Sequence, residues 1–468
     1  MVVAVQQLRG TYDYVIVGAG SAGFVLAKTL SQNASFKNRF DFNQAPAYYP
    51  LISEYFRNFA SRPDPKLGVF DEWAKVSGNS GLAWKSLLED FKAASHYDFQ
   101  QTDYEQFVNT TTYGDGPLEV SRTSGLTGFD APFASALKSG LGVHEVDLTD
   151  GIGTGLDLGV ANRPNVQMIP NAWVTKIGFS GKTSKNVTYT NTISNAKTTI
   201  AAKEIIVNAG AINSPKLPML SGVGQKARLS ELNIPLVADI PSIGTNLYDH
   251  TFPIVELEVS SDIKTGWQWE FNATGKNSVF DGINGTHYTS LPTDRPHILM
   301  KYSTVPLMST PNVSLVTAWA SLVQAEASGY VTLNSSDFRD DPFIYSNYYG
   351  SPADKKAVVW GYKKLREIMG SEELKSFVLK RGIPRQECSY SFHHPLGTVA
   401  LGKALDSNWG LRGLKSIRLV DVSTFPSPPS CHPLADVYAV AHRAAKDIRR
   451  ADKWLPVLRC TLHIRLDK

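Results

Sequence analysis

Residues 12–30 read YDYVIVGAGSAGFVLAKTL, and this stretch decides the fold. Tyr12–Val17 is a short run of β-forming residues, a glycine turn follows at once, and Phe24–Leu30 has apolar residues at helical spacing. Strand, glycine turn and helix in this order are typical of a dinucleotide-binding unit. Its glycines permit the tight turn, backbone approach to a pyrophosphate, and close helix packing. We expect these cofactor-binding residues here: Gly18, Gly20, Ser21, Ala22 and Gly23.

The segment after this helix lacks the next feature of such a unit. A second strand normally ends in an acidic residue that holds the adenosine ribose. Residues 31–50 read SQNASFKNRFDFNQAPAYYP and contain no convincing apolar strand. Asp41 lies at a tolerable distance but among Lys, Arg, Asn and Gln, so we interpret it as a surface residue. The glycine turn alone does not distinguish FAD from NAD.

The composition indicates a globular protein. The chain has 468 residues, of which 42% are apolar and 19% charged, enough for two domains. The net charge of +4 is small and the basic residues are scattered, so we expect no nucleic-acid partner. The most apolar stretch, Ile298–Leu322, is interrupted by Lys301 and two prolines, so we expect no membrane span. Three cysteines without a CxxC or zinc-like spacing predict no metal site.

The amino-terminal residues MVVAVQQLRGTYD lack the basic start and apolar middle of a secretory signal. This favours a cytoplasmic location. Asn-x-Ser/Thr sequons nevertheless suggest a secreted, glycosylated ancestor, unless they are coincidental. They occur at Asn33, Asn109, Asn186, Asn272, Asn284, Asn312 and Asn334.

Several further segments carry a more specific pattern. Residues 208–224 read NAGAINSPKLPMLSGVG, and residues 236–250 end in NLYDH. Towards the carboxyl end, residues 389–402 read SYSFHHPLGTVALG, and residues 417–445 read IRLVDVSTFPSPPSCHPLADVYAVAHRAA. Together and in this order they resemble the signatures of the glucose–methanol–choline (GMC) oxidoreductases, a family of FAD enzymes, and its fungal-type members in particular.

This resemblance implies FAD as the cofactor and His394 and His432 as the catalytic pair. Oxidation of an alcohol removes a proton from oxygen and a hydride from carbon, and neutral imidazole is a suitable base near pH 7. By resemblance His394 is the base and His432 the partner that holds the developing alkoxide. His393 replaces His394 if the register is one residue off. The resemblance also places these residues beside the cofactor: Val174, Asp421, Val422 and Pro433.

Parts of the family pattern are absent from this sequence. The Gly-Gly-x-Ser segment that wraps the flavin is missing before Phe70, and a Ser-rich stretch is missing between Gly159 and Asn165. The tail 454–468 has no recognisable counterpart. Three explanations stay open: a gene model with lost segments, an enzyme that holds FAD differently, or an inactive remnant. Loss of a central strand would expose sheet edges and lower stability. We expect His250 to make a structural hydrogen bond.

The expected architecture is α/β, with a discontinuous Rossmann-like FAD domain at 10–35, 151–250 and 395–450. A substrate domain with an antiparallel sheet and helices takes 50–150 and 251–394. The GMC N-terminal type of region covers about 10–250, and the C-terminal type about 300–445. The resemblance implies FAD-dependent oxidation of a small-molecule alcohol, with O2 or a quinone as acceptor, in fungal secondary metabolism or lignocellulose breakdown. The alternative is a flavin-containing, non-redox lyase or cyclase.

Overall fold

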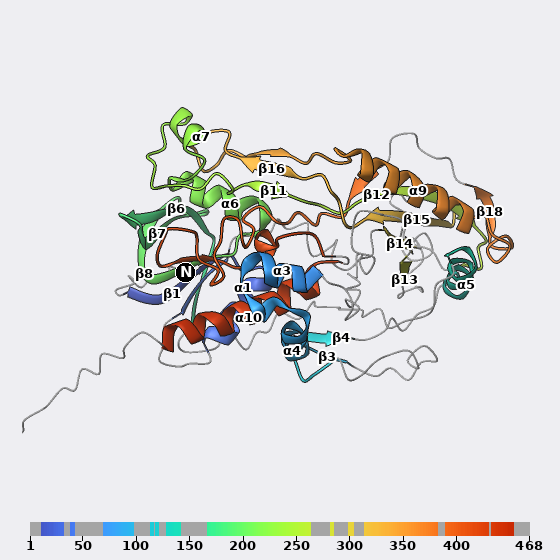
Figure 1. Cartoon of the computed structure of the whole chain (residues 1–468), viewed down its shortest axis with the longest axis horizontal. Helices are drawn as coiled ribbons and strands as arrows, with labels where there is room; N and C mark the ends of the chain where they lie inside the picture. Colours follow the sequence, from blue (N-terminus) through green and yellow to red (C-terminus); the bar gives the residue numbers. More distant parts are fainter. Residues whose placement is uncertain are drawn as a thin grey trace, which may run out of the picture.

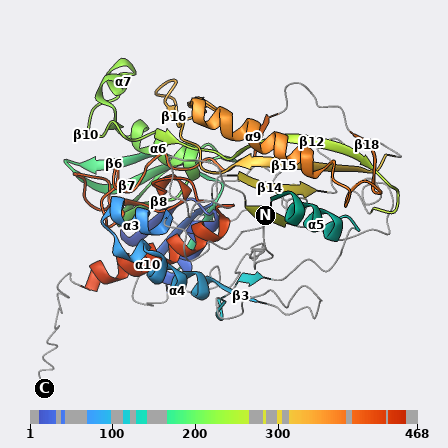
Figure 2. The same cartoon turned by 45° about the vertical axis from the view of Figure 1, so that its right-hand side comes forward.

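Two sheets, one towards each end of the long axis, organise the molecule (Figures 1 and 2). A mostly parallel sheet lies at one end and an antiparallel sheet at the other. This confirms the predicted α/β class with an antiparallel second region. The computed structural model describes residues 11–31, 38–42, 69–97, 113–116, 118–120, 128–141, 166–263, 281–284, 298–303, 313–381, 389–429 and 432–453.

The mostly parallel sheet is built around β1 (Thr11–Val17). Its strand order is β5-β2-β1-β8-β7-β6, and β20 also pairs with β8. Strands β1, β2, β5, β8 and β20 run parallel, whereas β6 and β7 form an antiparallel ribbon. Val15, Ile16 and Ile206 are fully buried, as central parallel strands require. The bounds are β2 (Asn38–Phe42), β5 (Val166–Pro170), β6 (Ala172–Ser180), β7 (Thr183–Asn191), β8 (Lys197–Val207) and β20 (Ile417–Leu419).

The expectation that the second strand is missing is wrong. β2 lies between β1 and β5, with Asp41 opposite Val17 on one side and Ile169 on the other. The sequence gives little apolar signal here because parallel neighbours on both sides satisfy the backbone groups of a strand whatever its side chains are. β1 is therefore not an exposed sheet edge. The side chain of Asp41 lies outside the described part of the chain.

Helices α1 (Ser21–Leu30), α4 (Trp84–Ala94) and α10 (Leu434–Lys453) form a layer against this sheet, with α10 between the other two (Figure 1). Asp90 of α4 is fully buried and joins it to α10. Its carboxylate accepts hydrogen bonds from Arg443, His442 and Lys446 at 2.8–2.9 Å. Burial raises the pKa of Asp90, but the His442 and Lys446 hydrogen bonds and the Arg443 charge bring it below its usual value.

The antiparallel sheet has the order β13-β14-β15-β12-β18, and β19 pairs with β12. Met300 and Tyr302 pack against α9 and α5 on one face in a separate apolar core. Side chains alternate along a strand, so Lys301 lies on the opposite face. The bounds are β12 (Thr251–Val259), β13 (Asp281–Asn284), β14 (Ile298–Ser303), β15 (Leu315–Leu322), β18 (Val378–Arg381), β19 (Ser389–Ser391), α5 (Asp130–Leu141) and α9 (Pro352–Ile368).

Shorter elements complete the described part of the fold. They are α3 (Val69–Ser77), α6 (Gly210–Leu220), α7 (Lys226–Glu231), β3 (Ser95–Tyr97), β4 (Leu118–Val120), β9 (Val223–Gly224), β10 (Ala238–Asp239), β11 (Thr245–Leu247), β16 (Gly329–Thr332) and β17 (Phe343–Tyr345), with 3-10 helices η1 (Ser80–Leu82) and η4 (Val422–Thr424). Within the described ranges, no helix has the length and apolar character needed to cross a bilayer. The tail 454–468 lies outside the described residues.

The buried Asp90 cluster predicts a large loss of stability on neutralisation. Asp90→Asn leaves Arg443 buried beside a neutral amide, so the free energy of unfolding at pH 7 should fall by about 3–5 kcal/mol. Because the folded-state pKa of Asp90 is lowered, this contribution is present above the unfolded-state pKa and is lost as pH falls through the folded value. Denaturant unfolding measures both effects. The control is Glu89→Gln, at an exposed pair with Lys92, which should change stability by less than about 0.5 kcal/mol. Equal losses in both variants would contradict a structural role for the cluster.

Candidate active site

The glycine turn between β1 and α1 has one open position and two crowded ones. Gly18 has a φ of 115°, and a Cβ there would lie 2.0 Å from the carbonyl oxygen of Asn208. A Cβ on Gly23 would lie 2.4 Å from Nδ2 of Asn208. At Gly20, the N-cap of α1, a Cβ would meet nothing within 4 Å. Gly18 and Gly23 therefore let the turn, the start of α1 and the segment at Asn208 approach one another closely. Gly20 instead faces open space at a helix N-terminus, where backbone N–H groups favour anions.

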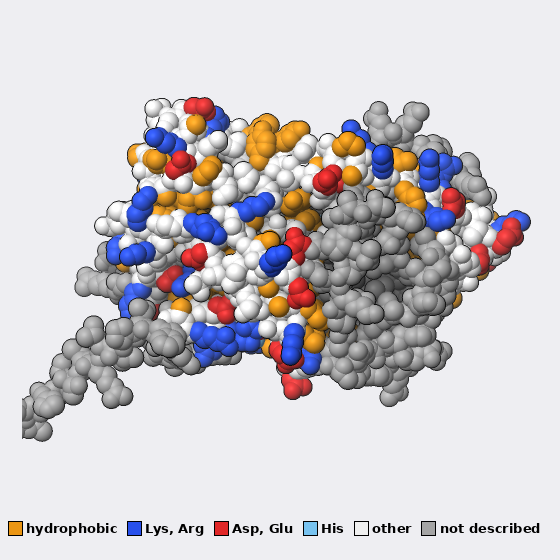
Figure 3. Space-filling model, viewed as in Figure 1, with side chains coloured by type: hydrophobic (Ala, Val, Ile, Leu, Met, Phe, Trp, Pro, Cys, Tyr) orange, Lys and Arg blue, Asp and Glu red, His pale blue; other side chains and the backbone are white. Residues whose placement is uncertain are grey.

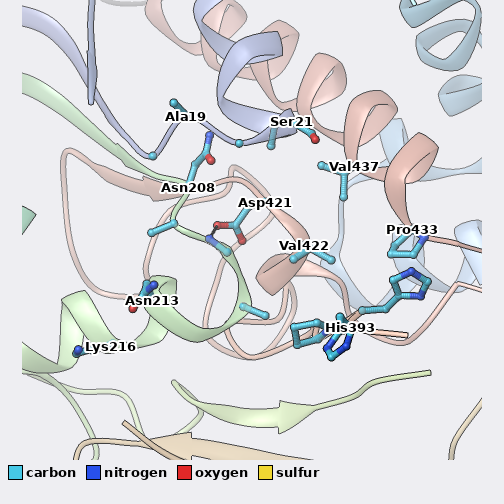
Figure 4. A pocket seen from close by; sticks show the side chains of 18 of the residues that line it. Ala19, Ser21, Asn208, Asn213, Lys216, His393, Asp421, Val422, Pro433 and Val437 are labelled. Atoms are coloured by element: carbon cyan, nitrogen blue, oxygen red, sulfur yellow. Dashed lines mark hydrogen bonds between the residues drawn. The ribbon is translucent and has the colours of Figure 1, made fainter. Parts of the chain in front are cut away.

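A cavity of about 830 Å³ extends from this turn to the imidazoles near the carboxyl end. Figure 4 shows Ala19 and Ser21 at one end, His393 and Pro433 at the other, and Asp421 and Val422 between them. A volume of this size suits a cofactor. The lining residues are Gly18, Ala19, Gly20, Ser21, Ala22, Asn171, Ala172, Trp173, Thr192, Asn208, Ala209, Gly210, Ala211, Asn213, Lys216, Asp341, His393, His394, Pro395, Asp421, Val422, His432, Pro433, Leu434 and Val437.

The structure brings most of the predicted site residues together at this cavity. Nine of them line it: Gly18, Gly20, Ser21, Ala22, Asp421, Val422, Pro433, His394 and His432. Gly23 lies behind the turn, against Gly18 and Asn208. Val174 is buried in β6, where it pairs with Tyr189, and its neighbours Ala172 and Trp173 line the cavity instead.

Two polar lining residues, Asn208 and Lys216, are among those that the sequence did not assign to the site. Asn208 follows β8 directly, beside the carboxyl end of β1, and its Nδ2 is buried without a hydrogen-bond partner among the described residues. The signal was present, because ligands bind at the carboxyl ends of parallel strands. Lys216 donates to the carbonyl oxygens of Phe338 and Asp340 at 2.8 and 2.7 Å. Burial lowers the pKa of Lys216.

The donors around the turn fit the diphosphate of a dinucleotide. The first turn of α1, the open position at Gly20 and the unsatisfied amide of Asn208 all lie at one end of the cavity. Buried polar groups are expected to find partners, and a bound phosphate or ribose oxygen would satisfy this amide. These residues would hold the pyrophosphate part of FAD.

Asp421 is a buried carboxylate in the middle of the cavity. It accepts hydrogen bonds from the hydroxyl of Ser214 at 2.5 Å, from the backbone N–H of Gly210 at 2.9 Å, and from the backbone N–H of Ser423 at 2.7 Å. Burial raises its pKa, and these hydrogen bonds oppose the rise. Asp421 thereby ties the start of α6 to η4 and fixes the backbone at Val422.

The two histidines face each other at the other end. Nδ1 of His432 and Nε2 of His394 are 3.2 Å apart, and the ring planes are nearly perpendicular, at 88°. Nδ1 of His394 lies 3.1 Å from Nδ1 of His250, so the hydrogen bond expected for His250 goes to this pair. His393 also lines the cavity.

Both histidines are kept neutral by their surroundings. Burial is the main cause that lowers the pKa of His394 and of His432 well below the usual value, and the Lys301 charge adds to it. A neutral imidazole at physiological pH can accept a proton. The pair therefore has the protonation state that a general base requires.

The segment Asp249–His250 holds the histidine loop in place. Asp249 accepts the backbone N–H of His394 at 2.9 Å and hydrogen bonds from the hydroxyl groups of Ser391 and of Tyr348. The backbone N–H of His393 donates to Ser391 Oγ at 2.7 Å, and His393 adopts a φ of 57°. This bend presents His394 to His432.

Aromatic rings surround the pair on the side of the antiparallel sheet. Phe392 stacks on His394 with an interplanar angle of 19° and meets the edge of His432 at 71°. Phe252 and Trp319 pack behind Phe392. Apolar rings exclude water from imidazoles, which explains the burial effect on their pKa values.

Solved structures share this fold. The chain superposes on formate oxidase with a TM-score of 0.80 at 20% identity, covering 95% of this chain and 99% of the other. A fungal aryl-alcohol oxidase gives a TM-score of 0.79 at 19% identity, covering 95% and 100%. Structures at this level of identity establish the fold.

Curated relatives match over nearly the whole chain. A glucose–methanol–choline family oxidoreductase from Annulohypoxylon moriforme is 24% identical, with 94% of each chain covered. An alcohol dehydrogenase [acceptor] from Pseudomonas putida is 27% identical, covering 94% and 96%. (R)-mandelonitrile lyase 3 from Prunus serotina is 29% identical, covering 91% and 83%. The first of these alignments has 579 positions, more than the 468 residues here, so that relative contains segments without a counterpart in this chain.

Two family models, both described as GMC oxidoreductase, match residues 62–252 and 325–441. They include α6, the Asp249–His250 segment, both His394 and His432, and the start of α10. The chain therefore belongs to the GMC oxidoreductase family, and its cofactor is FAD.

Proposed function

We propose that this protein oxidises an alcohol, with His394 as the base and His432 as the hydrogen-bond partner of the substrate oxygen. The observation that supports this most is the single cavity that joins the glycine turn to the neutral imidazole pair. FAD bound in this cavity would accept the hydride from the substrate carbon.

The pair divides the work on the hydroxyl group. Nε2 of His394 takes the proton, and the ring becomes an imidazolium whose Nδ1–H stays directed at His250. Nδ1–H of His432 donates to the oxygen as negative charge develops there. Phe392 excludes water from both rings, which strengthens this hydrogen bond. FAD, when bound, would supply the redox chemistry, with oxygen or a quinone as the final electron acceptor.

A second candidate is a non-redox lyase of the same family. It is favoured by one observation, the relative from Prunus serotina that is named a mandelonitrile lyase. A base and a hydrogen-bond donor at one substrate hydroxyl also suit the cleavage of a cyanohydrin. Turnover of mandelonitrile without any change in flavin absorption would support the lyase and contradict the oxidase.

The open position at Gly20 predicts that a substitution there weakens FAD binding with little loss of protein stability. Gly20→Ala adds a methyl group that meets no protein atom within 4 Å, so the cofactor-free protein should lose at most about 1 kcal/mol, the cost of a poorer N-cap. FAD should bind at least about tenfold more weakly, because the methyl group blocks the phosphate from the helix N-terminus. Titration with FAD and denaturant unfolding measure the two quantities.

Gly18→Ala is the matched comparison. The same methyl group there meets the Asn208 carbonyl oxygen at 2.0 Å on a backbone with φ of 115°, so the cofactor-free protein should lose about 3 kcal/mol or more. Wild-type FAD affinity in Gly20→Ala would show that phosphates do not approach this turn. Protein that stays colourless in excess FAD would instead indicate an inactive remnant.

Removal of the base predicts a loss of flavin reduction. His394→Ala should slow anaerobic flavin reduction by an alcohol roughly 100- to 10,000-fold, with little change in the oxidised flavin spectrum. Because burial lowers the pKa of His394, the wild-type rate should persist below the usual histidine pKa and fall only as pH drops through the lowered value. Stopped-flow absorption over a panel of primary and secondary alcohols, benzyl alcohol first, measures both.

The variant His393→Ala tests which of the two adjacent histidines, His393 or His394, is the base. The hydrogen bond and ring contact to His432 come from His394, so removal of His393 should leave most of the rate of flavin reduction in place. If His393→Ala abolishes flavin reduction and His394→Ala does not, the base is His393 and the assignment made above is wrong.

A further inference from the structure

A buried lysine from the antiparallel sheet contacts the catalytic pair. Nζ of Lys301 in β14 lies 2.7 Å from Nε2 of His432, and only 4% of Lys301 is exposed. Lys301 faces Trp319 across the sheet, on the face opposite the apolar core, and Trp319 contacts Phe392. Lys301 belongs to none of the sequence motifs that indicated the site.

The contact with Lys301 determines which nitrogen of each imidazole carries a proton. An ammonium group has three donors and no acceptor, so Nε2 of His432 must accept and its proton must lie on Nδ1. Nδ1–H then donates to Nε2 of His394, which places the proton of His394 on Nδ1. That proton in turn points at Nδ1 of His250. The four groups form one chain of hydrogen bonds with a single direction.

His250 is suited to accept at the end of this chain. Burial lowers its pKa to about 4, and the backbone carbonyls of Pro429 and Val323 oppose that effect. A neutral ring with an acceptor at Nδ1 carries its proton on Nε2, which is buried and makes no hydrogen bond of full geometry to a described residue. His250 therefore accepts from the base and remains neutral at physiological pH.

The charged and titratable groups around the pair come from four directions. Lys301 approaches from β14, His250 precedes β12, His393 is the chain neighbour of His394, and Asp249 accepts the backbone N–H of His394. Glu256 of β12 lies on the same face as Lys301 and accepts the Thr317 hydroxyl at 3.5 Å. Across the cavity, Asp421 is held by Ser214, Gly210 and Ser423. Among these groups, Lys301 and the neighbouring histidines disfavour a charged imidazole in the pair.

We infer that Lys301 is a positioning residue that fixes the tautomer of His432 and keeps the catalytic pair neutral, with His250 as the acceptor at the other end. The inference rests on the proposed function of His394 as the base. With this tautomer, His432 offers a donor to the substrate oxygen while His394 offers an acceptor to its proton. The reverse tautomers would present the wrong group at both positions.

Nitrogen NMR of the FAD-loaded protein labelled with ¹⁵N-histidine tests this inference without turnover. In the wild type, the ring of His432 should show a proton on Nδ1, and both rings of the pair should titrate well below the usual histidine pKa. Lys301→Met removes both charge and donor, so His432 should lose its fixed tautomer and the pKa of both rings should rise by about one unit. Lys301→Gln removes the charge and leaves an amide that can donate or accept, so it should raise the pKa of both rings without fixing the tautomer of His432.

The control is Lys363→Met, which removes an exposed charge from α9 in the same region and should leave tautomer and titration as in the wild type. The inference would be overturned if, in Lys301→Met, His432 kept its wild-type tautomer and both rings kept their wild-type pKa values. If Lys301→Met does not fold, Lys301→Gln decides alone, and an unchanged titration there overturns the inference.

The pH profile of flavin reduction by benzyl alcohol adds a second readout. Lys301→Met should move the acid limb of the profile upward by about one pH unit, whereas a purely structural defect would lower the rate at every pH without moving the limb. If no alcohol reduces the wild-type flavin, the proposed function fails, and the NMR result still decides the role of Lys301 independently.

Discussion

The packing of α1 against α10 is the constraint on which the site depends. Both helices begin at the cavity: α1 starts directly after Gly20, and α10 starts two residues after His432. Their contact along the sheet therefore sets the distance between the phosphate-binding turn and the imidazoles (Figure 1). The hydroxyl of Tyr438 in α10 makes a hydrogen bond with Ser21 at the start of α1, so the two helix starts are joined at the cavity itself. The Asp90 cluster anchors α10 from its other side.

The antiparallel sheet completes the imidazole end and determines its chemistry. It supplies Lys301 from β14, while the segment before β12 supplies Asp249 and His250. Phe392, next to β19, covers the pair with an apolar ring. His432 thus precedes α10 of the mostly parallel region, whereas His394 follows β19 of the antiparallel sheet. The contacts that set the tautomers, orientation and burial of both rings come from the antiparallel sheet and the segments next to it.

The parts of this fold that the sequence predicts are those encoded locally. Gly18 indicates the turn through its positive φ and Gly23 through the close approach of Asn208, and His394 and His432 lie within recognisable motifs. β2 was not predicted, because its strand conformation depends on pairing with β1 and β5 rather than on its own residues. The roles of Lys301 and His250 were not predicted for a similar reason, since both contacts join residues that lie more than 100 positions apart in the sequence. The predicted domain boundaries are statements about such long-range packing, and they remain predictions.

Burial links the chemistry of the site to the stability of the empty protein. Three imidazoles and the amide of Asn208 are withdrawn from water at the cavity, and buried polar groups without full hydrogen bonding cost free energy. A ligand that binds only the folded state recovers part of this cost by mass action. FAD in this chain would therefore act as a structural element as well as the oxidant. Several flavin-contacting segments of the family pattern are missing from the sequence, so the remaining contacts at Gly20, Asn208 and the start of α1 must supply a larger share of that stabilisation.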